Sequence, residues 1–362
     1  MMVRRPFSLF FVVFVVLAAT QAPAQNQTQT QTPPAVSVPV MPNDPTQLMQ
    51  LAPQVNGLGS PDMKPWHLKA TYQTFDDQGK PINQGTFEEW WAGPKKDRRV
   101  YTSAAFTQTE YRTAAGNFRV GSQDGPPLSE YLVRARLIDP MPAEKDMEGT
   151  QLQRREDPFP KTKLNCVELA RPMKRAEHGS PVGLFPLYCF DTDKPILRFS
   201  GSYGLLNSSY ERIGELAGHY IGLDVRISDW KTTFVTIHVE SANLLSQVND
   251  VDFIPPVETQ VLPAGAVLEV PSGVLAGRKL SGSVPAYPVL AKQGRIEGRV
   301  SLAALISEDG HIRELRVVEA PDPSLALAAL MAVHDWRYQP YLLNGHPVEV
   351  QTTINVIYRL GG

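Results

Sequence analysis

The last quarter of the chain shows the clearest alternation of apolar and polar residues. Apolar side chains recur at every second position over residues 298–307, and again over Ile312–Glu319 after the pair Asp309-Gly310. A period of two is typical of a half-buried β-strand. Asp-Gly favours a two-residue type I′ turn, which needs positive φ at both positions. The pattern therefore predicts a β-hairpin that closes on a type I′ turn.

A helix and a third strand are predicted after this hairpin. The helix begins near Pro323, whose fixed φ suits a first helical turn, and five apolar residues then share one helical face: Leu325, Ala329, Ala332, Val333 and Trp336. Asn344-Gly345 marks another turn. Residues 348–360 then alternate strictly, which predicts a strand with one buried and one wet face. The expected order is strand, strand, helix, strand.

The middle of the chain is rich in short strand patterns. They are separated by turn residues, which is typical of an antiparallel sheet. Strands are predicted over residues 66–75, 86–91, 99–105, 109–114, 163–169, 187–190, 196–200, 219–230 and 233–241, and a helix over 128–137. We expect a large curved sheet with a helix against it. Together with the C-terminal part, this predicts an α+β protein. Neighbouring Trp90 and Trp91 should point to opposite faces of their strand.

The N-terminus has the pattern of an export signal. Arg4 and Arg5 precede an apolar run over residues 7–19, and Ala22-Pro23-Ala24 resembles a cleavage site. As a helix the run is about 20 Å long, shorter than the ~30 Å core of a bilayer. We therefore predict a signal peptide over 1–24 and a periplasmic protein. The alternative is an uncleaved anchor in the inner membrane that leaves the chain facing the periplasm.

Composition then divides the rest of the chain. Residues 25–60 are rich in Gln, Thr and Pro and predict a disordered linker. Residues 251–283 are rich in Pro and Gly and predict a connector. The β-rich domain is thus expected over 61–250 and the small α+β domain over 284–362. Formal net charge is −2, with no basic stripe, which argues against a nucleic-acid partner.

Patterns of known chemistry are almost absent. Seven histidines are scattered without metal-ligand spacing, and no phosphate-binding loop, dinucleotide fingerprint or nucleophile elbow occurs. Ser228 and Lys231 match S-x-x-K in letters only, because they fall in a strand pattern. We expect no enzyme activity, metal or cofactor. Cys166 and Cys189, the only cysteines, fall in predicted strands of an exported chain, so a disulfide is predicted; two free thiols are the alternative.

Several C-terminal features occur in the order known from one family. They are Tyr287-Pro288, the strand after Gly298, Asp309-Gly310, Ala332-Val333 before Trp336-Arg337-Tyr338-Gln339-Pro340, and Asn344-Gly345-His346-Pro347-Val348. Residues ~275–362 resemble the TonB carboxy-terminal domain. The resemblance implies a periplasmic module that takes part in TonB-dependent transmembrane transport and protein transport. Such a module binds outer-membrane transporters by pairing a strand with their N-terminal peptide. The resemblance implies no catalysis.

The N-terminal segment differs from the TonB family in a residue linked to energy transduction. In the TonB family an uncleaved N-terminal helix carries a serine and a histidine that engage proton-motor membrane subunits. The corresponding segment here contains Ser8 but no histidine. An energy transducer that contacts those subunits therefore remains open only if the chain is anchored.

The terminal strand is the candidate binding site. If it lies at the sheet edge, its unpaired N–H and C=O groups form a template for an added strand. The candidate residues are Gln351, Thr352, Thr353, Ile354, Asn355, Val356 and Ile357, and the resemblance adds Tyr287 and Pro288. The expected partner is an outer-membrane TonB-dependent transporter or another envelope protein. The edge could instead be merely tolerated, or pair with a second copy in a homodimer.

The middle domain is faintly similar to the half-barrel of lipoprotein carriers such as LolA. That similarity implies a concave sheet that holds lipid or another apolar ligand. A periplasmic carrier is therefore the alternative function. A scaffold or protein-docking sheet is the other interpretation of this domain.

Overall fold

The computed structural model describes residues 39–361 apart from 77, 123–125, 156–161, 172–183, 203–205, 230–231, 258 and 263–266. The described chain belongs to one compact unit, Val38–Gly362. The predicted export segment, residues 25–38, Trp230 and Lys231 lie outside the described residues. Within the described ranges, no helix combines the length and the apolar character needed to cross a membrane.

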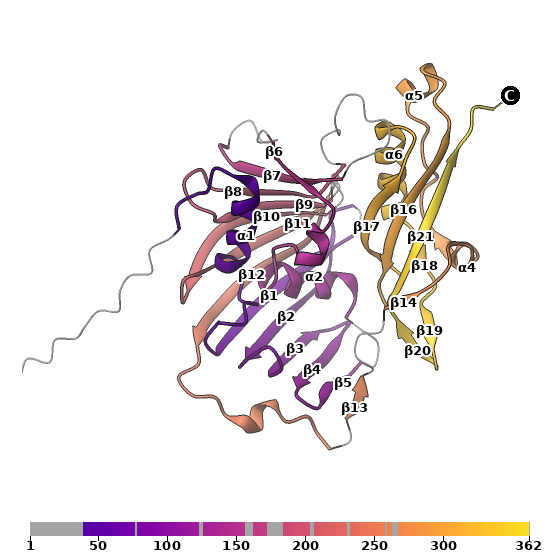
Figure 1. Cartoon of the computed structure of the whole chain (residues 1–362). Coiled ribbons are helices and arrows are strands. Elements are labelled where there is room, and N and C mark those ends of the chain that lie inside the picture. Colours follow the sequence, from indigo (N-terminus) through magenta and orange to yellow (C-terminus); the bar gives the residue numbers. More distant parts are fainter. Residues whose placement is uncertain are drawn as a thin grey trace, which may run out of the picture. The chain divides into compact units, whose positions relative to one another are not determined.

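A large antiparallel sheet dominates the first part of the described chain (Figure 1). Thirteen described strands follow the order β13-β5-β4-β3-β2-β1-β12-β11-β10-β9-β8-β7-β6. Their bounds are β1 (Trp66–Phe75), β2 (Pro81–Trp91), β3 (Asp97–Ser103), β4 (Thr107–Thr113), β5 (Gly116–Gly121), β6 (Gln151–Arg155), β7 (Asn165–Ala170), β8 (Leu187–Phe190), β9 (Leu197–Ser202), β10 (Leu206–Leu216), β11 (His219–Ser228), β12 (Thr233–Leu244) and β13 (Gln260–Leu262). The predicted sheet is confirmed, and β5, β6, β10 and β13 are additions to it. β13 pairs with β5 and comes from residues 251–283, which were predicted to be only a connector.

The two faces of this sheet differ in what they contact. We call the face of Trp66 and Leu68 the inner face, because both side chains are fully buried, and the opposite face the outer face. Helices α1 (Pro45–Val55) and α2 (Leu128–Leu137) lie against the sheet (Figure 1). Trp91 points inward and stacks on Trp66 with 6.0 Å between ring centroids. Trp90 points outward and stacks on His67 at 4.5 Å, as the alternation predicted.

Helix α1 corrects the predicted linker. Residues 25–60 were expected to be disordered throughout, yet Leu48, Met49 and Ala52 on α1 are fully buried in the core of the sheet domain. The side chain of Asp44 caps the helix by accepting from the N–H of Gln47 at 2.9 Å, and Pro45 occupies its first turn. Gln and Pro dominate the composition of this stretch. The apolar residues nevertheless fall on one helical stripe, and their burial stabilises the helix.

The C-terminal part has its own sheet, and its apolar core also includes Ala170, Leu184 and Phe185 from earlier in the chain. Four strands follow the order β14-β21-β16-β17, with bounds β14 (Leu268–Glu269), β16 (Gly298–Ile306), β17 (Ile312–Glu319) and β21 (Val350–Tyr358). Helix α6 (Pro323–His334) packs on this sheet. The order strand, strand, helix, strand and the α+β class are as predicted.

The remaining elements of the described chain are short. They are α3 (Glu144–Met147), the 3₁₀ turn η1 (Asp250–Phe253), α4 (Ser272–Ala276), β15 (Lys279–Ser281), α5 (Val289–Gln293), β18 (Arg337–Tyr338), β19 (Tyr341–Leu343) and β20 (His346–Val348).

The hairpin between β16 and β17 differs from the predicted type I′ turn. Only Gly310 has a positive φ, +82°, whereas Asp309 does not. The N–H of Gly310 bonds to the carbonyl of Ser307, and the N–H of Ser307 bonds to that of His311. This is the longer loop in which a left-handed glycine follows a tight turn. A Cβ at Gly310 would stand 1.9 Å from the carbonyl oxygen of Tyr338, so close approach also requires glycine.

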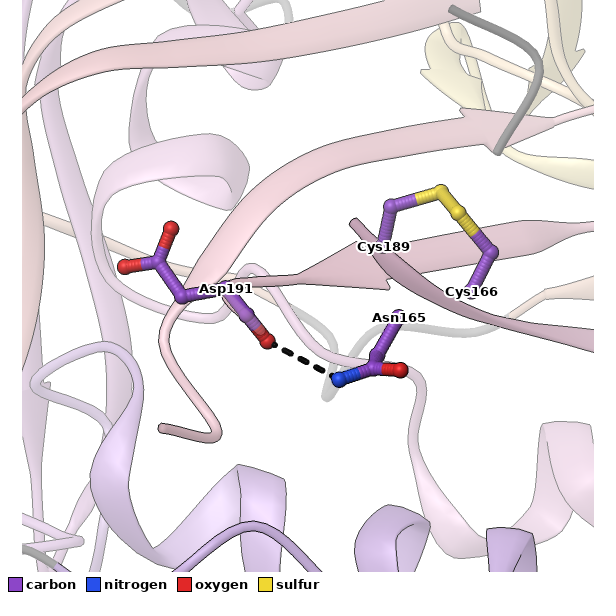
Figure 2. The surroundings of a disulfide bond; sticks show 4 residues. All are labelled: Asn165, Cys166, Cys189 and Asp191. Carbon is purple, nitrogen blue, oxygen red and sulfur yellow. Dashed lines mark hydrogen bonds between the residues drawn. A yellow bond between two sulfur atoms is a disulfide. The ribbon is translucent and has the colours of Figure 1, made fainter. Parts of the chain in front are cut away.

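The predicted disulfide joins Cys166 on β7 to Cys189 on β8 (Figure 2). The two residues are direct cross-strand partners, and both are fully buried. Beside them the Asn165 amide donates to the carbonyl of Asp191 at 3.3 Å. The bond therefore fixes the register of two neighbouring strands of the large sheet.

Candidate partner-binding edge

Strand β21 alternates between buried and exposed residues along its whole length. Ile354 and Val356 point into the core beneath α6, and Thr352 is buried as well. Thr353, Asn355 and Ile357 are exposed, with Ile357 60% accessible. The strand is thus half buried, as the alternation predicted. Within the candidate residues 351–357, only every second side chain is therefore exposed.

One side of β21 is fully paired. From Val350 to Tyr358 it runs antiparallel to β16, with Val356 opposite Val300 and Asn355 opposite Ser301. Residues of an antiparallel pair alternate between those that bond to the partner and those that face away. The carbonyls of Glu349 and Gln351 accept from the opposite side, where β14 lies. By the same alternation, the backbone groups of Thr353, Asn355 and Ile357 also face away from β16.

The other side of β21 is occupied only at its start. The N–H groups of Leu268 and Val270 donate to Glu349 and Gln351, both at 2.9 Å. The Thr352 hydroxyl donates to the carbonyl of Val270 at 2.7 Å. Beyond this point no described strand pairs with β21 on that side. Gln351 and Thr352 are therefore already used, and the open edge begins at Thr353.

Tyr287 and Pro288 do not belong to this open edge. The Tyr287 hydroxyl donates to the carbonyl of Ile296 at 2.7 Å, and its ring packs edge-on against Tyr358 at 5.3 Å. Pro288 occupies the N-cap position of α5 and makes no side-chain capping hydrogen bond. Tyr287 thus braces the end of β21 from within the domain. Ser301, which sequence reasoning missed, donates to the side chain of Asn355 at 2.8 Å.

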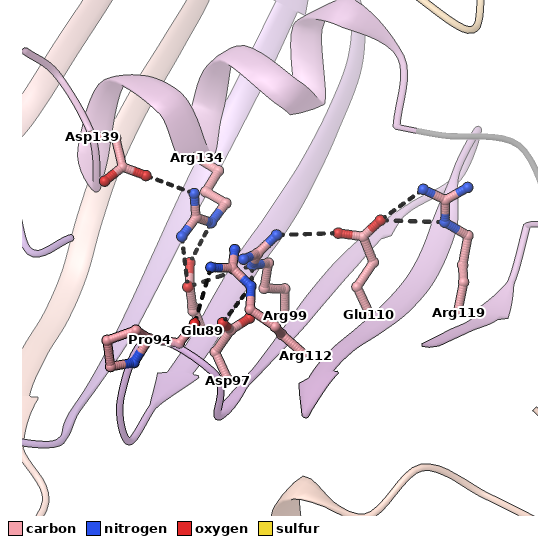
Figure 3. Close-up of polar contacts among 9 residues, drawn as sticks. All are labelled: Glu89, Pro94, Asp97, Arg99, Glu110, Arg112, Arg119, Arg134 and Asp139. Atoms are coloured by element: carbon pink, nitrogen blue, oxygen red, sulfur yellow. Dashed lines mark hydrogen bonds and ion pairs between the residues drawn. The ribbon is translucent and has the colours of Figure 1, made fainter. Parts of the chain in front are cut away.

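The inner face of the large sheet tests the carrier interpretation, because a carrier needs an apolar lining there. Instead a row of alternating charges crosses β2 to β5 (Figure 3). Its members are Glu89, Arg99, Glu110 and Arg119. Arg134 of α2 donates to both carboxylate oxygens of Glu89, at 2.9 and 3.0 Å. Glu89 is fully buried, so this ion pair lies between the helix and the sheet.

A second pair extends the charged row. Asp97 is 1% exposed and lies 3.0 Å from Arg99 and 3.1 Å from Arg112. Burial raises the pKa of Asp97, and the two arginines oppose that shift. Burial likewise lowers the pKa of Arg112. Groups that are this costly to bury persist because each charge has a partner. The row is a structural network, and its charges are unsuited to contact with an acyl chain.

The space around the helices is also small. The cavity that is lined by Asn56 of the α1 end, Leu137 of α2 and Tyr210 of β10 has a volume of about 10 Å³. That is barely room for one water molecule, whereas pockets for small ligands usually measure about 300–1,000 Å³. Helices α1 and α2 fill the described interior with buried side chains. The described part of the sheet domain therefore offers no open apolar cavity at this position.

Solved structures resemble the sheet domain only distantly. The LolA superfamily protein of Nitrosomonas europaea is 12% identical, with a TM-score of 0.38, over 58% of this chain and 97% of that one. A DUF1329 family protein of Desulfovibrio piger is 11% identical, with a TM-score of 0.37, over 58% and 95%. MucB is 12% identical, with a TM-score of 0.28, over 61% and 69%. These likenesses are too distant to assign the domain a function.

The C-terminal part has a more specific match. Residues 283–360 match the family described as the Gram-negative bacterial TonB protein C-terminal. Protein TonB of Pseudomonas aeruginosa is 28% identical over 109 residues, which covers 28% of this chain and 31% of that protein. This chain thus spans less than a third of its relative's length. The C-terminal residues 283–360 are therefore similar to the TonB C-terminal domain.

Proposed function

We propose that this protein binds an envelope partner by adding a strand of that partner to the open edge of β21. The partner class follows from the TonB C-terminal domain, whose family serves TonB-dependent transport. An outer-membrane TonB-dependent transporter is the first candidate, and the protein then acts in the periplasm. One observation supports the proposal above all: the backbone groups of Thr353, Asn355 and Ile357 face away from β16 and find no described strand.

The exposed side chains of this edge suit an added strand. Backbone pairing supplies most of the affinity in strand addition, and alternate side chains supply specificity. Ile357 offers apolar surface beside its own free backbone groups. A free charge on Glu349 could hinder an added strand at this edge. That charge is neutralised, because Glu349 pairs with Arg313. The stretch available for pairing is short, since β14 already occupies the carbonyl of Gln351.

Proline substitutions at neighbouring positions test this geometry. Proline removes one N–H and is tolerated in a strand only where that N–H is unpaired. Asn355→Pro should keep the fold and abolish binding, because the N–H of Asn355 faces the open edge. Val356→Pro should unfold the domain, because the N–H of Val356 faces β16. Thr353→Ala, which removes no backbone group, should bind like the wild type.

The assay is fluorescence anisotropy with a labelled N-terminal peptide of the transporter. Circular dichroism must first show that Asn355→Pro is folded. Normal capture of the peptide by a folded Asn355→Pro variant would reject strand addition at this edge. The C-terminal domain would then be a structural or dimerising module, which analytical ultracentrifugation would detect.

A further inference from the structure

The outer face of the large sheet carries a hollow that the C-terminal domain does not explain. It has a volume of about 630 Å³, which lies within the range of ligand sites. Eight of its lining residues form two rows that run across β2, β1, β12 and β11. The first row is Thr86, Thr71, His238 and Asp224, and the second is Gln84, Gln73, Thr236 and Arg226.

Within each row the residues are direct cross-strand neighbours. Adjacent strands lie about 4.8 Å apart, so each row measures roughly 14 Å from end to end. The two rows are two residues apart along the strands, which is about 7 Å. The outer-face groove, as we call this hollow, thus presents polar groups at regular intervals. Its shape suits an extended ligand that crosses the strands.

The charges in the outer-face groove are already paired. Asp224 accepts from Arg212 and lies 2.7 Å from Nδ1 of His238. The hydrogen bond from Arg212 is the main reason why the pKa of Asp224 is lowered to about 2. Arg226 lies 3.3 Å from Glu211. Because the groove has no unmatched charge of either sign, a strongly ionic ligand gains little here.

Four neutral side chains are left to recognise a ligand. Among the described residues, the side chains of Gln73, Gln84, Thr86 and Thr236 make no hydrogen bond. Hydroxyl and amide groups each donate and accept, so the four can bind a ligand with the same mixed character. His238 adds an acceptor at Nε2, since we assign its proton to Nδ1 from the bond to Asp224.

Other ligand classes fit this groove less well. The apolar residues of its floor, Tyr72, Val225 and Ile237, are at most 3% exposed, which leaves little surface for lipid. All four strands are paired on both sides, so they offer no backbone groups to an extended peptide. Nucleic acid would need a net positive surface. A neutral polymer that carries many hydroxyl and amide groups matches all three restrictions.

We propose that the outer-face groove binds a neutral glycan, which lies across β2, β1, β12 and β11. The neutral Thr and Gln side chains hydrogen-bond the sugar hydroxyl and acetamido groups. Successive sugar units follow the regular spacing of the strands. This binding is independent of strand addition at β21, because no groove residue belongs to the C-terminal domain.

Isothermal titration calorimetry of the full chain tests the proposal. The probes are chitohexaose, maltohexaose and a neutral peptide of alanine, serine and threonine. The Gln73→Ala/Gln84→Ala double variant should bind the preferred glycan at least tenfold more weakly than the wild type. Thr109→Ala is the matched control, because Thr109 is a polar residue of the same face outside the groove, and it should bind normally.

The proposal is overturned if neither glycan binds at millimolar concentration or if the double variant binds as well as the control. Equal or tighter binding of the peptide would overturn it too. Histidine-selective NMR of the wild type gives an answer that does not depend on a variant. The glycan should shift the ring signals of His238 more than those of the other histidines, and a spectrum without that shift contradicts the proposal.

Discussion

Removing the carboxylate of Glu89 should destabilise the sheet domain strongly. In the Glu89→Leu variant the guanidinium of Arg134 loses two hydrogen bonds, at 2.9 and 3.0 Å. Arg99 loses a contact at 3.5 Å. Arg134 keeps Asp139 at 2.8 Å, and Arg99 keeps Asp97 at 3.0 Å. The network therefore loses one negative charge in a place where Arg134 is only 16% exposed.

The expected cost follows from this partial compensation. Breaking a buried ion pair on one side typically costs about 3–5 kcal/mol, because the remaining charge stays buried without its partner. Asp139 is half exposed and still neutralises part of Arg134, so we expect a value near 3 kcal/mol. Replacing both partners, in Glu89→Leu/Arg134→Met, leaves no unpaired charge between helix and sheet. Its free energy of unfolding should lie within about 2 kcal/mol of the wild type.

Equilibrium unfolding in urea, followed by tryptophan fluorescence, measures both variants together with Arg134→Met. The coupling energy of the double-mutant cycle separates the pair from its surroundings. If both single variants stay within about 1 kcal/mol of the wild type, the pair is not the buried structural link described above. The inner face would then be open to solvent or to a ligand, and the carrier interpretation would regain support.

Three further predictions concern single features. The Cys166→Ser/Cys189→Ser variant should lose about 3 kcal/mol of unfolding free energy by the loop-entropy estimate, and thiol labelling of the unreduced, denatured wild type should detect no free thiol. Burial raises the pKa of Asp309, but His311 and neighbouring donors lower it to about 2. Its stabilisation, roughly 2 kcal/mol, should therefore be present above pH ~4 and disappear as the pH falls through about 2; Asp309→Asn should lack this loss in urea unfolding between pH 5 and 2. Mass spectrometry of the exported protein should find Gln25 at its N-terminus, and an intact chain in the membrane fraction would favour the anchored alternative.

Much of the fold could be predicted because its strands alternate cleanly. β1, β8, β17 and α2 have the predicted bounds, and the two tryptophans of β2 point to opposite faces as expected. The hairpin that joins β10 to β11 has only a weak signal in the sequence. Its turn is Ala217-Gly218, with φ of +52° and +87°, and alanine is a poor signal for a left-handed conformation. Without a recognised turn, β10 had no predicted end.

Helix α1 shows the limit of reasoning from composition. Gln and Pro around residues 39–55 indicate disorder, and only the spacing of Leu48, Met49 and Ala52 reveals a helix that can be buried. A lone amphipathic helix of this length is marginal in water. Its stability comes from the inner face of the sheet, which is built by strands far along the chain. That contribution cannot be read from the local sequence.

The candidate edge illustrates the same division between local and distant information. Alternation within residues 348–360 determines which side chains of β21 are buried, so the polar face could be predicted from the sequence. Whether a backbone N–H of β21 is free depends on its two neighbouring strands, β16 and β14. Of these, β14 lies about eighty residues earlier in the chain than β21. β14 is two residues long and has no alternation that could reveal it. It nevertheless removes Gln351 from the candidate site and leaves Thr353, Asn355 and Ile357. The direction of the backbone N–H groups alternates from residue to residue along β21. Proline at position 355 should therefore abolish binding, whereas proline at the neighbouring position 356 should unfold the domain.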